Sequence, residues 1–586
     1  MVSALEWVLV GIVGYTVVVM ALRAAEKLPD YVRGTGPIVT LHTQRGKRIL
    51  DRLARPKRLW RAWGNLGIGI AIVVMVGTLI VTLFSAYQSL VDPQPTPLTE
   101  PQNVLVIPGV NEFLPLSVAP EIIAGLVIAL IVHEGGHGIF CRVADIDIDS
   151  MGLAFFSFIP VGAFVGPDEE SVVKANRGDQ TRMFVAGVTN NFAIGFLALL
   201  LLFGPVIGAF GIVAGVPVGD ALPGGPAAQA GLDSGDVITG VEGQAVANNS
   251  EFRDALADAP ATVTLDTKDG ESTTVERRLY VKAAATDAPV SRNETITAVN
   301  GTAVRTSSGY VEAIRNRTVV RLSRAGGDDV TTPIGAYTRV RENGSLAAAG
   351  VEPGSVAIVT AADGERVYTW RNLESVIDET EAGATIDLVA YVDGERRPLT
   401  VDLADAGRAE LDLGVLKADG TSGFVVNDLG IDQYPAVTFL EMLGGDGNVD
   451  SQYDGYSFLL RAGLMLLLPF MGIAGLFNYS FPGFTGIATN FYTVEGPLAA
   501  LGTGGAFLVA NLLFWTAWIN LLVGQFNLFP TYPLDGGHIL RTMTESVVAR
   551  LPIEDGRRAT TLITLAISAI VLGSMAMLFI GPQLLA

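Results

Sequence analysis

The run His133-Glu134-Gly135-Gly136-His137 carries the side chains best suited to chemistry in this sequence. In a helix, positions four residues apart lie on one face, so the two imidazoles can bind one zinc ion. Glu134 would then lie beside the water on the metal. The motif follows an unbroken apolar run, residues 122–132, where ionisable side chains are costly and tend to mark function. The alternative is a pair of hydrogen-bonded buried histidines.

A catalytic zinc site needs a third protein ligand and an open position for water. Cys141 is the only cysteine, which excludes a cysteine cage and leaves a distant Asp or Glu as the third ligand. The candidate is Asp535, in the segment Asn-Leu-Phe-Pro-Thr-Tyr-Pro-Leu-Asp-Gly-Gly-His that ends at His538. Its prolines and glycines break helix geometry, which is tolerated at membrane depth only where backbone lines a cavity. The alternative is an ordinary turn at the membrane surface. As a fourth ligand His538 would close the site to water, so we expect it outside the ligand set.

The length and apolarity of the chain indicate the elements that must position these residues. With 586 residues, 49% of them hydrophobic, and a mean hydropathy of +0.43, the chain is too long for one core and too apolar for an ordinary soluble enzyme. Seven runs are long enough to cross about 30 Å of hydrocarbon: residues 4–22, 66–86, 122–140, 183–207, 458–477, 506–528 and 560–580.

The charge of the chain limits its partners. It has 59 acidic and 39 basic residues, a formal net charge of −20, and most of the basic residues are arginine. So acidic a surface argues against nucleic acid as a partner. An acidic, lysine-poor surface is typical of proteins from halophilic archaea, where salt screens the repulsion between carboxylates. Membrane lipid and other proteins are the partners that we expect.

Positive charges predict the orientation of the chain in the cell membrane. The loop between Arg23 and Arg61 is rich in Arg and Lys, whereas none occurs between Arg61 and Arg142. By the positive-inside rule this loop is cytoplasmic, and the motif at His133 lies near the cytoplasmic side. The long soluble insertion is then extracellular. With this topology the run at residues 458–477 has to be re-entrant or to have a weak return partner.

The insertion, roughly residues 216–452, repeats a short apolar alternation that ends in a glycine turn. The clearest copies are residues 236–243 and 294–301, with a weaker one at 355–364. Each is typical of a strand and hairpin, and the repetition predicts tandem small modules. The first copy resembles a PDZ domain, and we expect the middle one to be partial. Such domains usually bind extended peptides at a sheet edge; the alternative is a spacer without a ligand.

These patterns together predict a multi-pass α-helical membrane protein with an inserted α+β, β-rich extramembrane region of tandem PDZ-like domains. The expected parts are an N-terminal membrane hairpin with a basic cytoplasmic loop (1–118), a first catalytic membrane half (119–215), a PDZ-like domain (216–283), a partial PDZ-like module (284–342), a PDZ-like domain with a linker (343–452), and a second catalytic membrane half with the last helix (453–586).

The His-Glu-x-x-His motif in an apolar helix, a distant Leu-Asp-Gly after an Asn-Leu-x-Pro segment, and a PDZ-like insertion between them resemble the site-2 protease family. The resemblance covers residues 122–191 and 506–540. It implies that His133, His137 and Asp535 hold one zinc ion per chain and that Glu134 is the general base.

A third element of that family, Gly-Pro-x-x-Asn, corresponds here to the run Gly-Val-Thr-Asn-Asn from Gly187 to Asn191. Val188 stands where the family has proline, so this element departs from the pattern. Asn191 is still placed to hydrogen-bond the substrate backbone or the developing oxyanion. Asn190 could share or take over that role, and a polar contact between helices is the alternative.

Residues 151–166, rich in aromatic residues and glycine, resemble the membrane-associated β element of the same family. A protease has to unwind a helical substrate, because hydrogen-bonded helical backbone shields the scissile carbonyl. An exposed strand edge at this element could capture the extended form.

The resemblance implies an intramembrane zinc endopeptidase that cleaves membrane-anchored proteins, as in regulated intramembrane proteolysis. Zinc lowers the pKa of a bound water towards about 7, and Glu134 takes the proton and passes it to the leaving amine. Two alternatives stay open. One is a membrane protease that cuts soluble or lipidated tails at the surface, and the other is a non-catalytic membrane scaffold whose modules bind peptides.

Overall fold

The structure is a computed structural model. The chain divides into two compact units, which we call the helical unit (Met1–Gly211, Val437–Thr489 and Thr493–Ala586) and the strand-rich unit (Ile212–Ala436 and Asn490–Tyr492). The chain passes between them through β5 (Phe210–Ile212), α14 (Ala436–Met442) and β24 (Tyr492–Val494), of which β5 and β24 pair. The residues described are 4–25, 27–29, 31–35, 38–91, 103, 107–111, 113–156, 159–342, 344–380, 383–403, 415–418, 420–445 and 455–585.

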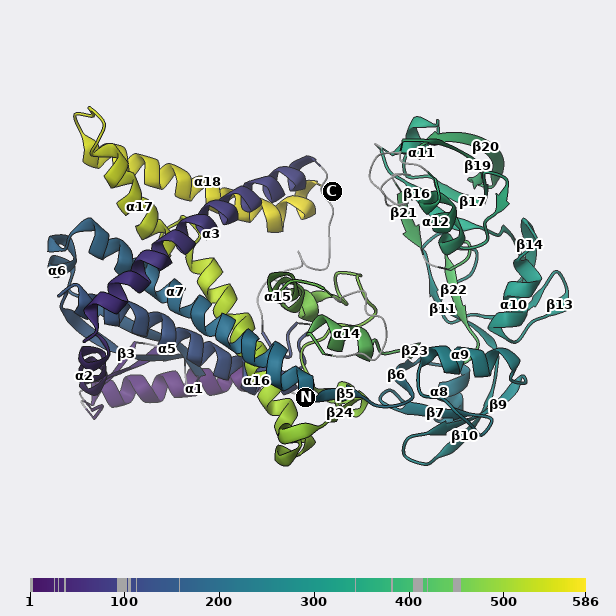
Figure 1. The fold of residues 1–586 in the computed structure, drawn as a ribbon, viewed down its shortest axis with the longest axis horizontal. Coiled ribbons are helices and arrows are strands. Elements are labelled where there is room, and N and C mark those ends of the chain that lie inside the picture. The colour runs from purple at the N-terminus through teal and green to yellow at the C-terminus, as the bar shows by residue number, and fades with distance from the viewer. Residues whose placement is uncertain are drawn as a thin grey trace. The chain divides into compact units, whose positions relative to one another are not determined.

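Within this described part, five helical segments of the helical unit are long and apolar enough to cross a membrane: Lys57–Val91, Leu116–Val143, Arg177–Ala209, Gly496–Asn527 and Gly556–Pro582. They contain α3 (Lys57–Val91), α5 (Ala119–Val143), α7 (Arg177–Leu201), α16 (Gly502–Asn527) and α18 (Gly556–Leu585) (Figure 1). Each falls on a predicted apolar run, since a helix satisfies its backbone polar groups internally and presents only apolar side chains to lipid. The protein is therefore a multi-pass membrane protein.

The two other predicted runs form α1 and α15. Residues 4–22 belong to α1 (Ala4–Ala24), of which Val13–Ala24 is described as an apolar helix. α15 (Phe458–Leu467) continues through a 3₁₀ turn, and the apolar helix Phe458–Phe470 is about 20 Å long at 1.5 Å per residue. That is shorter than the hydrocarbon core of about 30 Å. The segment is thus too short to cross on its own, as a re-entrant segment would be.

Helices α5, α7 and α16 pack against one another and form the core that carries the predicted motifs. Small residues let their backbones approach closely. A Cβ added at Gly136 of α5 would lie 2.8 Å from the carbonyl oxygen of Ala186 in α7, and one at Gly125 would lie 2.9 Å from that of Trp515 in α16. A side chain at either glycine would push the helices apart.

A four-stranded antiparallel sheet packs against α5, in the order β1-β2-β3-β4. The strands are β1 (Val32–Thr35), β2 (Ile38–His42), β3 (Ile148–Phe156) and β4 (Ile159–Pro167). β3 and β4 form a hairpin where the sequence predicts the β element, and β4 is an edge strand. Between β2 and α3 lies α2 (Gln44–Leu53), which also packs on α5; α6 (Glu169–Lys174) follows β4.

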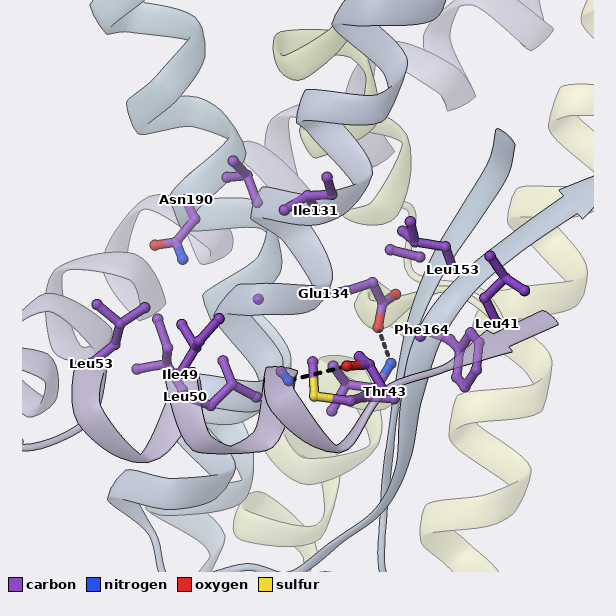
Figure 2. A pocket seen from close by; sticks show the side chains of 18 of the residues that line it. Leu41, Thr43, Ile49, Leu50, Leu53, Ile131, Glu134, Leu153, Phe164 and Asn190 are labelled. Atoms are coloured by element: carbon purple, nitrogen blue, oxygen red, sulfur yellow. Dashed lines mark hydrogen bonds between the residues drawn. The ribbon is translucent and has the colours of Figure 1, made fainter. Parts of the chain in front are cut away.

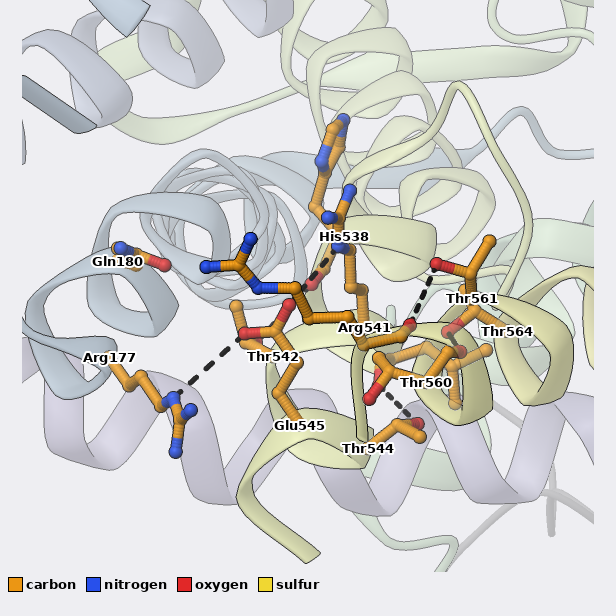
Figure 3. A network of polar contacts seen from close by, with 12 residues as sticks. Arg177, Gln180, His538, Arg541, Thr542, Thr544, Glu545, Thr560, Thr561 and Thr564 are labelled. Carbon is orange, nitrogen blue, oxygen red and sulfur yellow. Dashed lines mark hydrogen bonds and ion pairs between the residues drawn. The ribbon is translucent and has the colours of Figure 1, made fainter. Parts of the chain in front are cut away.

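Helix α17 (Asp535–Val548) packs against α7 and α18. Glu545 of α17 lies 3.3 Å from Arg541, one turn earlier, and 3.9 Å from Arg177 at the start of α7 (Figure 3). The first pair lies within α17, and only the second joins α17 to α7. Because Asp535 is the first residue of α17, the packing of this helix on α7 and α18 places its carboxylate.

The strand-rich unit contains three modules, each built on a six-stranded sheet of the same strand order. The first comprises β6 (Val216–Ala221), α8 (Pro226–Ala230), β7 (Val237–Val241), β8 (Gln244–Ala245), α9 (Asn249–Asp258), β9 (Thr262–Thr267) and β10 (Ser272–Glu276). The second comprises β11 (Leu279–Ala284), β12 (Thr295–Val299), β13 (Thr302–Ala303), α10 (Ser307–Ile314), β14 (Val319–Arg324) and β15 (Val330–Pro333). The third comprises β16 (Ala336–Val340), α11 (Ser345–Ala348), β17 (Val356–Ala362), β18 (Glu365–Arg366), α12 (Trp370–Asp378), β19 (Thr385–Val392) and β20 (Glu395–Asp402).

The sixth strand of each sheet comes from one returning segment that visits the modules in reverse order. β21 (Val415–Ala418) pairs with β16, β22 (Phe424–Asn427) with β11, and β23 (Ile431–Gln433) with β6. The modules are therefore nested rather than consecutive. The boundaries expected near residues 283 and 342 separate the first and second sheets from their last strands, because a local repeat gives no sign of a short strand supplied from far along the chain.

The middle module, expected to be partial, has a complete six-stranded sheet and a hydrophobic core of its own. Phe424 of the returning strand is buried in that core. The feature that this module lacks is a helix between β11 and β12, within residues that are all described, where the other two modules have α8 and α11. The middle module therefore differs from the other two by one short helix, and it is not partial as expected.

A buried ion pair joins the first two modules. Arg277 is 2% exposed, and its Nε and Nη2 atoms donate to Asp428 Oδ2 at 3.1 and 2.5 Å. Its Nη1 donates to the carbonyl of Leu256 at the end of α9 (2.9 Å). Asp428 Oδ2 also accepts from the backbone of Ser307 at the start of α10 (2.9 Å). The pair thus ties both helices to the returning segment.

Candidate metal centre

The two histidines of the motif lie on α5 and face Asp535, the first residue of α17. His133 Nε2 lies 3.1 Å and His137 Nε2 3.3 Å from Asp535 Oδ2, and the two imidazole nitrogens are 3.2 Å apart. The three side chains are 8, 13 and 14% exposed. The fold therefore brings together the three residues that the sequence indicates as metal ligands.

The spacing and chemistry of these atoms fit a zinc ion. Tetrahedral zinc with ligands at about 2.0 to 2.1 Å holds its ligand atoms about 3.3 Å apart, which agrees with the three observed spacings. In the metal-binding tautomer both Nε2 atoms and the carboxylate oxygen are acceptors, so a cation is needed among them. Among the residues that the structure describes, buried Asp535 Oδ2 has no conventional hydrogen-bond donor. Two His and one carboxylate make a catalytic zinc set with a fourth position for water.

Helix α7 holds the far side of both imidazoles. His137 Nδ1 lies 2.8 Å from the carbonyl oxygen of Met183, and His133 Nδ1 lies 3.3 Å from Nδ2 of Asn191. A carbonyl at Nδ1 accepts a hydrogen bond from Nδ1–H, so that the proton stays on Nδ1 and Nε2 is left unprotonated and directed at the position of the metal. The contact with Met183 gives this orientation to His137 directly.

Gly187, between those two positions on α7, leaves the room that the imidazoles need. A Cβ added there would lie 2.7 Å from His137 Nε2 and 2.8 Å from two atoms of the His133 ring. These distances are shorter than real Cβ contacts, so any side chain would displace the rings. The glycine of the Gly-Val-Thr-Asn-Asn run is thus explained by the metal centre.

We expect Gly187→Ala to weaken zinc binding by about 10- to 100-fold, the cost typical of disturbing groups that orient metal ligands. The measurement is competition for zinc between the purified protein and a chelator of known affinity. Gly204→Ala, in the same helical stretch but with nothing within 4 Å of the added Cβ, is the matched control. Equal zinc affinity in the two variants would show that the rings do not need this space.

The backbone before Asp535 turns sharply, as its prolines and glycines predict. α16 ends at Asn527 and α17 begins at Asp535. A Cβ at Gly536 would lie 2.3 Å from the carbonyl oxygen of Phe529, and one at Gly537 would lie 2.7 Å from that of Thr531. The loop therefore packs directly on the first turn of α17, which directs Asp535 at the histidines.

His538 lies outside the group of three. Its ring stacks on Phe184 with centroids 4.7 Å apart and an interplanar angle of 9°, and meets the edge of Tyr532 at 5.0 Å. This sandwich holds the ring one helical turn beyond Asp535, where it packs α17 against α7.

Glu134 stands at a cavity of about 620 Å³ within the helical unit. Its Oε2 atom accepts a hydrogen bond from the backbone N–H of Val165 in β4 (2.8 Å) (Figure 2). The cavity is lined mainly by apolar side chains of α2, β2, β3, β4, α5 and α7. The carboxylate is thus anchored through one oxygen in a largely apolar space.

The two asparagines of α7 have different surroundings. Asn190 lines the cavity, and its Oδ1 accepts from Trp63 Nε1 (2.9 Å). Asn191 is fully buried beside His133, and its Oδ1 has no hydrogen-bond partner among the residues that the structure describes. The sequence treats the two as near equivalents, whereas the fold separates them.

Three partners in the site were not identified from the sequence: the Met183 carbonyl, the Val165 amide and the Trp63 indole. Two of them are backbone groups, which carry no residue signal. Trp63 is one of two tryptophans near the start of an apolar helix, a position where tryptophan is common in membrane proteins.

Comparison with known proteins adds a family. The sequence profile of Peptidase family M50 matches residues 121–571. An uncharacterized protein of Methanocaldococcus jannaschii is 28% identical over 167 residues, which cover 28% of this chain and 42% of that protein. A protein of Agrobacterium fabrum, named as a candidate zinc metalloprotease, is 26% identical over 221 residues, 36% of this chain and 51% of that protein. The chain thus aligns with about half, or less, of each relative. Because the profile spans both motifs and most of the chain, the resemblance to the site-2 proteases is confirmed, and the chain belongs to peptidase family M50, whose members are membrane zinc metallopeptidases.

Proposed function

We propose that this protein is an intramembrane zinc endopeptidase that cleaves membrane-anchored proteins. The observation that carries the proposal is the group of His133, His137 and Asp535, built on apolar helices beside a cavity that reaches Glu134. Because His133 and His137 lie on the membrane helix α5, a metal held there would act on substrates within the bilayer or at its edge. Regulated intramembrane proteolysis is the process that such an activity serves.

Glu134 is the general base. Zinc, when bound, polarises the scissile carbonyl and lowers the pKa of water towards about 7. The carboxylate of Glu134 is anchored through Oε2 by Val165 and uses its other oxygen to take a proton from the attacking water. It then delivers that proton to the leaving amide nitrogen. The apolar lining of the cavity keeps bulk water from competing for these groups.

The substrate backbone binds in extended form along β4. The N–H of Val165 bonds Glu134 rather than another strand, so the free edge of β4 faces the general base. A peptide added to this edge would satisfy its own backbone groups, which a helix unwound in lipid otherwise leaves unpaired. Its scissile carbonyl would then lie beside Glu134.

The two asparagines divide the role that the sequence gives to either. Asn190 lines the cavity, so it is the one placed to hydrogen-bond the substrate backbone or the oxyanion. Asn191 positions His133. A half-turn of its amide, which exchanges oxygen and nitrogen, places the unpartnered Oδ1 where Nδ2 lies 3.3 Å from His133 Nδ1. Oδ1 then accepts a hydrogen bond from His133 Nδ1–H, as the Met183 carbonyl does from His137.

Substitution of Asn191 separates these roles. Asn191→Leu, similar in size but without an acceptor, is expected to weaken zinc binding by about 10- to 100-fold, whereas Asn191→Asp, which keeps an acceptor, retains it. Chelator competition gives both affinities. If Asn191→Leu binds zinc like the wild type and loses only peptide cleavage, the side chain serves the substrate instead.

The three modules of the strand-rich unit are PDZ-like peptide-binding domains that engage substrate segments. Each sheet ends in a strand of the returning segment, β21, β22 or β23, and a sheet edge is where an extended peptide adds a strand. By the positive-inside rule, the arginine-rich loop before α3 supports an active site near the cytoplasmic side of the cell membrane, with the modules outside the cell.

Cleavage of a single-span membrane protein by the full chain in liposomes tests this function. Mass spectrometry of the products locates the cut, and the proposal expects it inside the apolar span or at its edge. A cut confined to a soluble tail would favour a surface protease. Zinc-loaded protein that cuts no single-span substrate, but binds peptides, would favour a scaffold.

A further inference from the structure

Six arginines form an exposed surface at the start of the first long membrane helix. We call it the arginine surface: Arg45, Arg48 and Arg52 of α2, Arg55 in the following turn, and Arg58 and Arg61 of α3. Within the described part of the chain, none of the six makes an ion pair. The chain has 59 acidic residues and only 39 basic ones. Six arginines together are therefore a marked positive surface on an acidic protein, where an anionic partner can bind.

The neighbouring lysines behave differently. Lys47 donates to the carbonyl oxygens of Ile148 and Asp149 at 2.7 and 2.9 Å, and Lys57 lies 2.7 Å from Asp145. They tie α2 and the start of α3 to the end of α5 and to β3. The lysines therefore fix the helices, and the arginines stay available on the outside.

The arginine surface lies where a membrane begins. α3 is a membrane-spanning helix whose apolar part starts just after Arg61, and no Lys or Arg follows until Arg142. Between the arginines lie exposed apolar side chains: Ile49, Leu53 and Leu59 are 57, 48 and 66% exposed. Short basic helices with apolar residues on another face lie in the plane of the membrane interface.

We propose that the arginine surface binds the phosphate groups of anionic phospholipids, with Leu59 inserted among the acyl chains and Ile49 and Leu53 lining the neighbouring cavity. Guanidinium groups match phosphate oxygens through two parallel hydrogen bonds, which suits arginine better than lysine. Basic residues next to a spanning helix attract anionic headgroups from the same leaflet. A phosphate in a lipid satisfies both halves of this surface at once, whereas a soluble phosphate satisfies only the charged half.

Lipid binding at this surface also affects the cavity that Glu134 lines. Leu50 is the buried residue of α2, and its Cδ1 would lie 2.5 Å from a Cβ added at Gly138 of α5, one residue after His137. Leu50 and Ile49 line the same cavity as Glu134. Bound lipid thus holds α2 as a wall of the cavity. This consequence rests on the proposed function, whereas the binding itself does not.

The test titrates the full chain, purified in detergent, with phosphatidylglycerol or phosphatidylcholine. Native mass spectrometry counts bound lipid, and the unfolding midpoint reports stabilisation. Each basic residue near an anionic membrane surface strengthens binding about five-fold. Arg45→Gln with Arg48→Gln and Arg52→Gln should therefore weaken phosphatidylglycerol binding by about 100-fold and leave phosphatidylcholine binding unchanged.

Two further triple variants control for charge and folding. Arg253→Gln with Arg315→Gln and Arg396→Gln makes the same charge change at exposed arginines of the strand-rich unit and should bind like the wild type. Arg→Lys at the three positions of α2 keeps the charge and should retain most of the binding. Equal binding of the two lipids by the wild type, or equal losses in both Gln triples, would overturn the proposal, as would equal stabilisation by inorganic phosphate. None of these readouts depends on proteolysis.

Discussion

Glu134→Gln should lower the rate of peptide cleavage by about 10² to 10⁴-fold, the usual contribution of a general base, while the protein keeps its zinc. The amide has the size of the carboxylate and can still accept from Val165 N–H through its oxygen. It cannot take a proton from water. Since Glu134 is not among the three side chains whose ligand atoms converge, its neutralisation leaves the metal centre intact.

Cleavage of a single-span substrate and zinc content, measured on the same liposome preparation, check this result. Glu170→Gln removes an exposed carboxylate of α6, 83% exposed and paired only with Lys174 across the helix surface, and should leave both quantities unchanged. A Glu134→Gln protein that cleaves at more than about a tenth of the wild-type rate would remove Glu134 from the chemistry. A variant that loses zinc would make Glu134 part of the metal centre instead.

Asp535→Ala should remove the metal itself. Structural zinc sites with four ligands bind with about 10 to 16 kcal/mol, or about 3 kcal/mol for each ligand, so loss of one ligand weakens binding by at least about 10²-fold. The two Nε2 atoms, 3.2 Å apart, would also face each other without the carboxylate that lies between 3.1 and 3.3 Å from both. Cleavage should disappear at zinc concentrations that saturate the wild type.

Zinc affinity by chelator competition, followed by cleavage assays at rising zinc, distinguishes this effect from misfolding. If Asp535→Ala still folds, excess zinc should restore part of the activity. Asp254→Ala, at an exposed position of α9, is the control and should bind zinc normally. Wild-type zinc affinity in Asp535→Ala would contradict the assignment of this residue as the third ligand.

The convergence of His133, His137 and Asp535 could be predicted because the residue types and their local sequence indicate a shared site. His133 and His137 share a helix face by spacing alone. Asp535 could be identified because a carboxylate in apolar sequence is energetically costly and tends to mark function, and because prolines and glycines flank it. Their approach to within 3.3 Å could not be derived from spacing, since it depends on the packing of α5, α7 and α17.

The supporting groups were harder to predict. Asn191 and Asn190 are neighbours in sequence, but successive helix positions point about 100° apart, and only the fold shows which one meets His133 and which one meets the cavity. The contact of the Met183 carbonyl with His137 could not be predicted, because every residue type has a backbone carbonyl. Prediction therefore reached the three side chains that converge and stopped at the groups that contact them.

In the strand-rich unit, too, local features could be predicted and long-range contacts could not. Repeated strand-and-turn patterns correctly indicated small β-rich modules. The nested arrangement was missed because β21, β22 and β23 are strands of three or four residues, too short for a period to be recognised. A local sequence pattern cannot indicate a strand that pairs with a module two modules earlier in the sequence, as β23 does with β6.

The most direct test of the central account is removal and return of zinc in the reconstituted wild-type protein. One zinc ion per chain should be found by elemental analysis, a chelator should abolish cleavage of a single-span substrate, and stoichiometric zinc should restore it, with the cut inside the apolar span or at its edge. Cleavage that continues unchanged after zinc has been removed, or zinc-loaded protein that cuts no membrane-anchored substrate, would contradict the account.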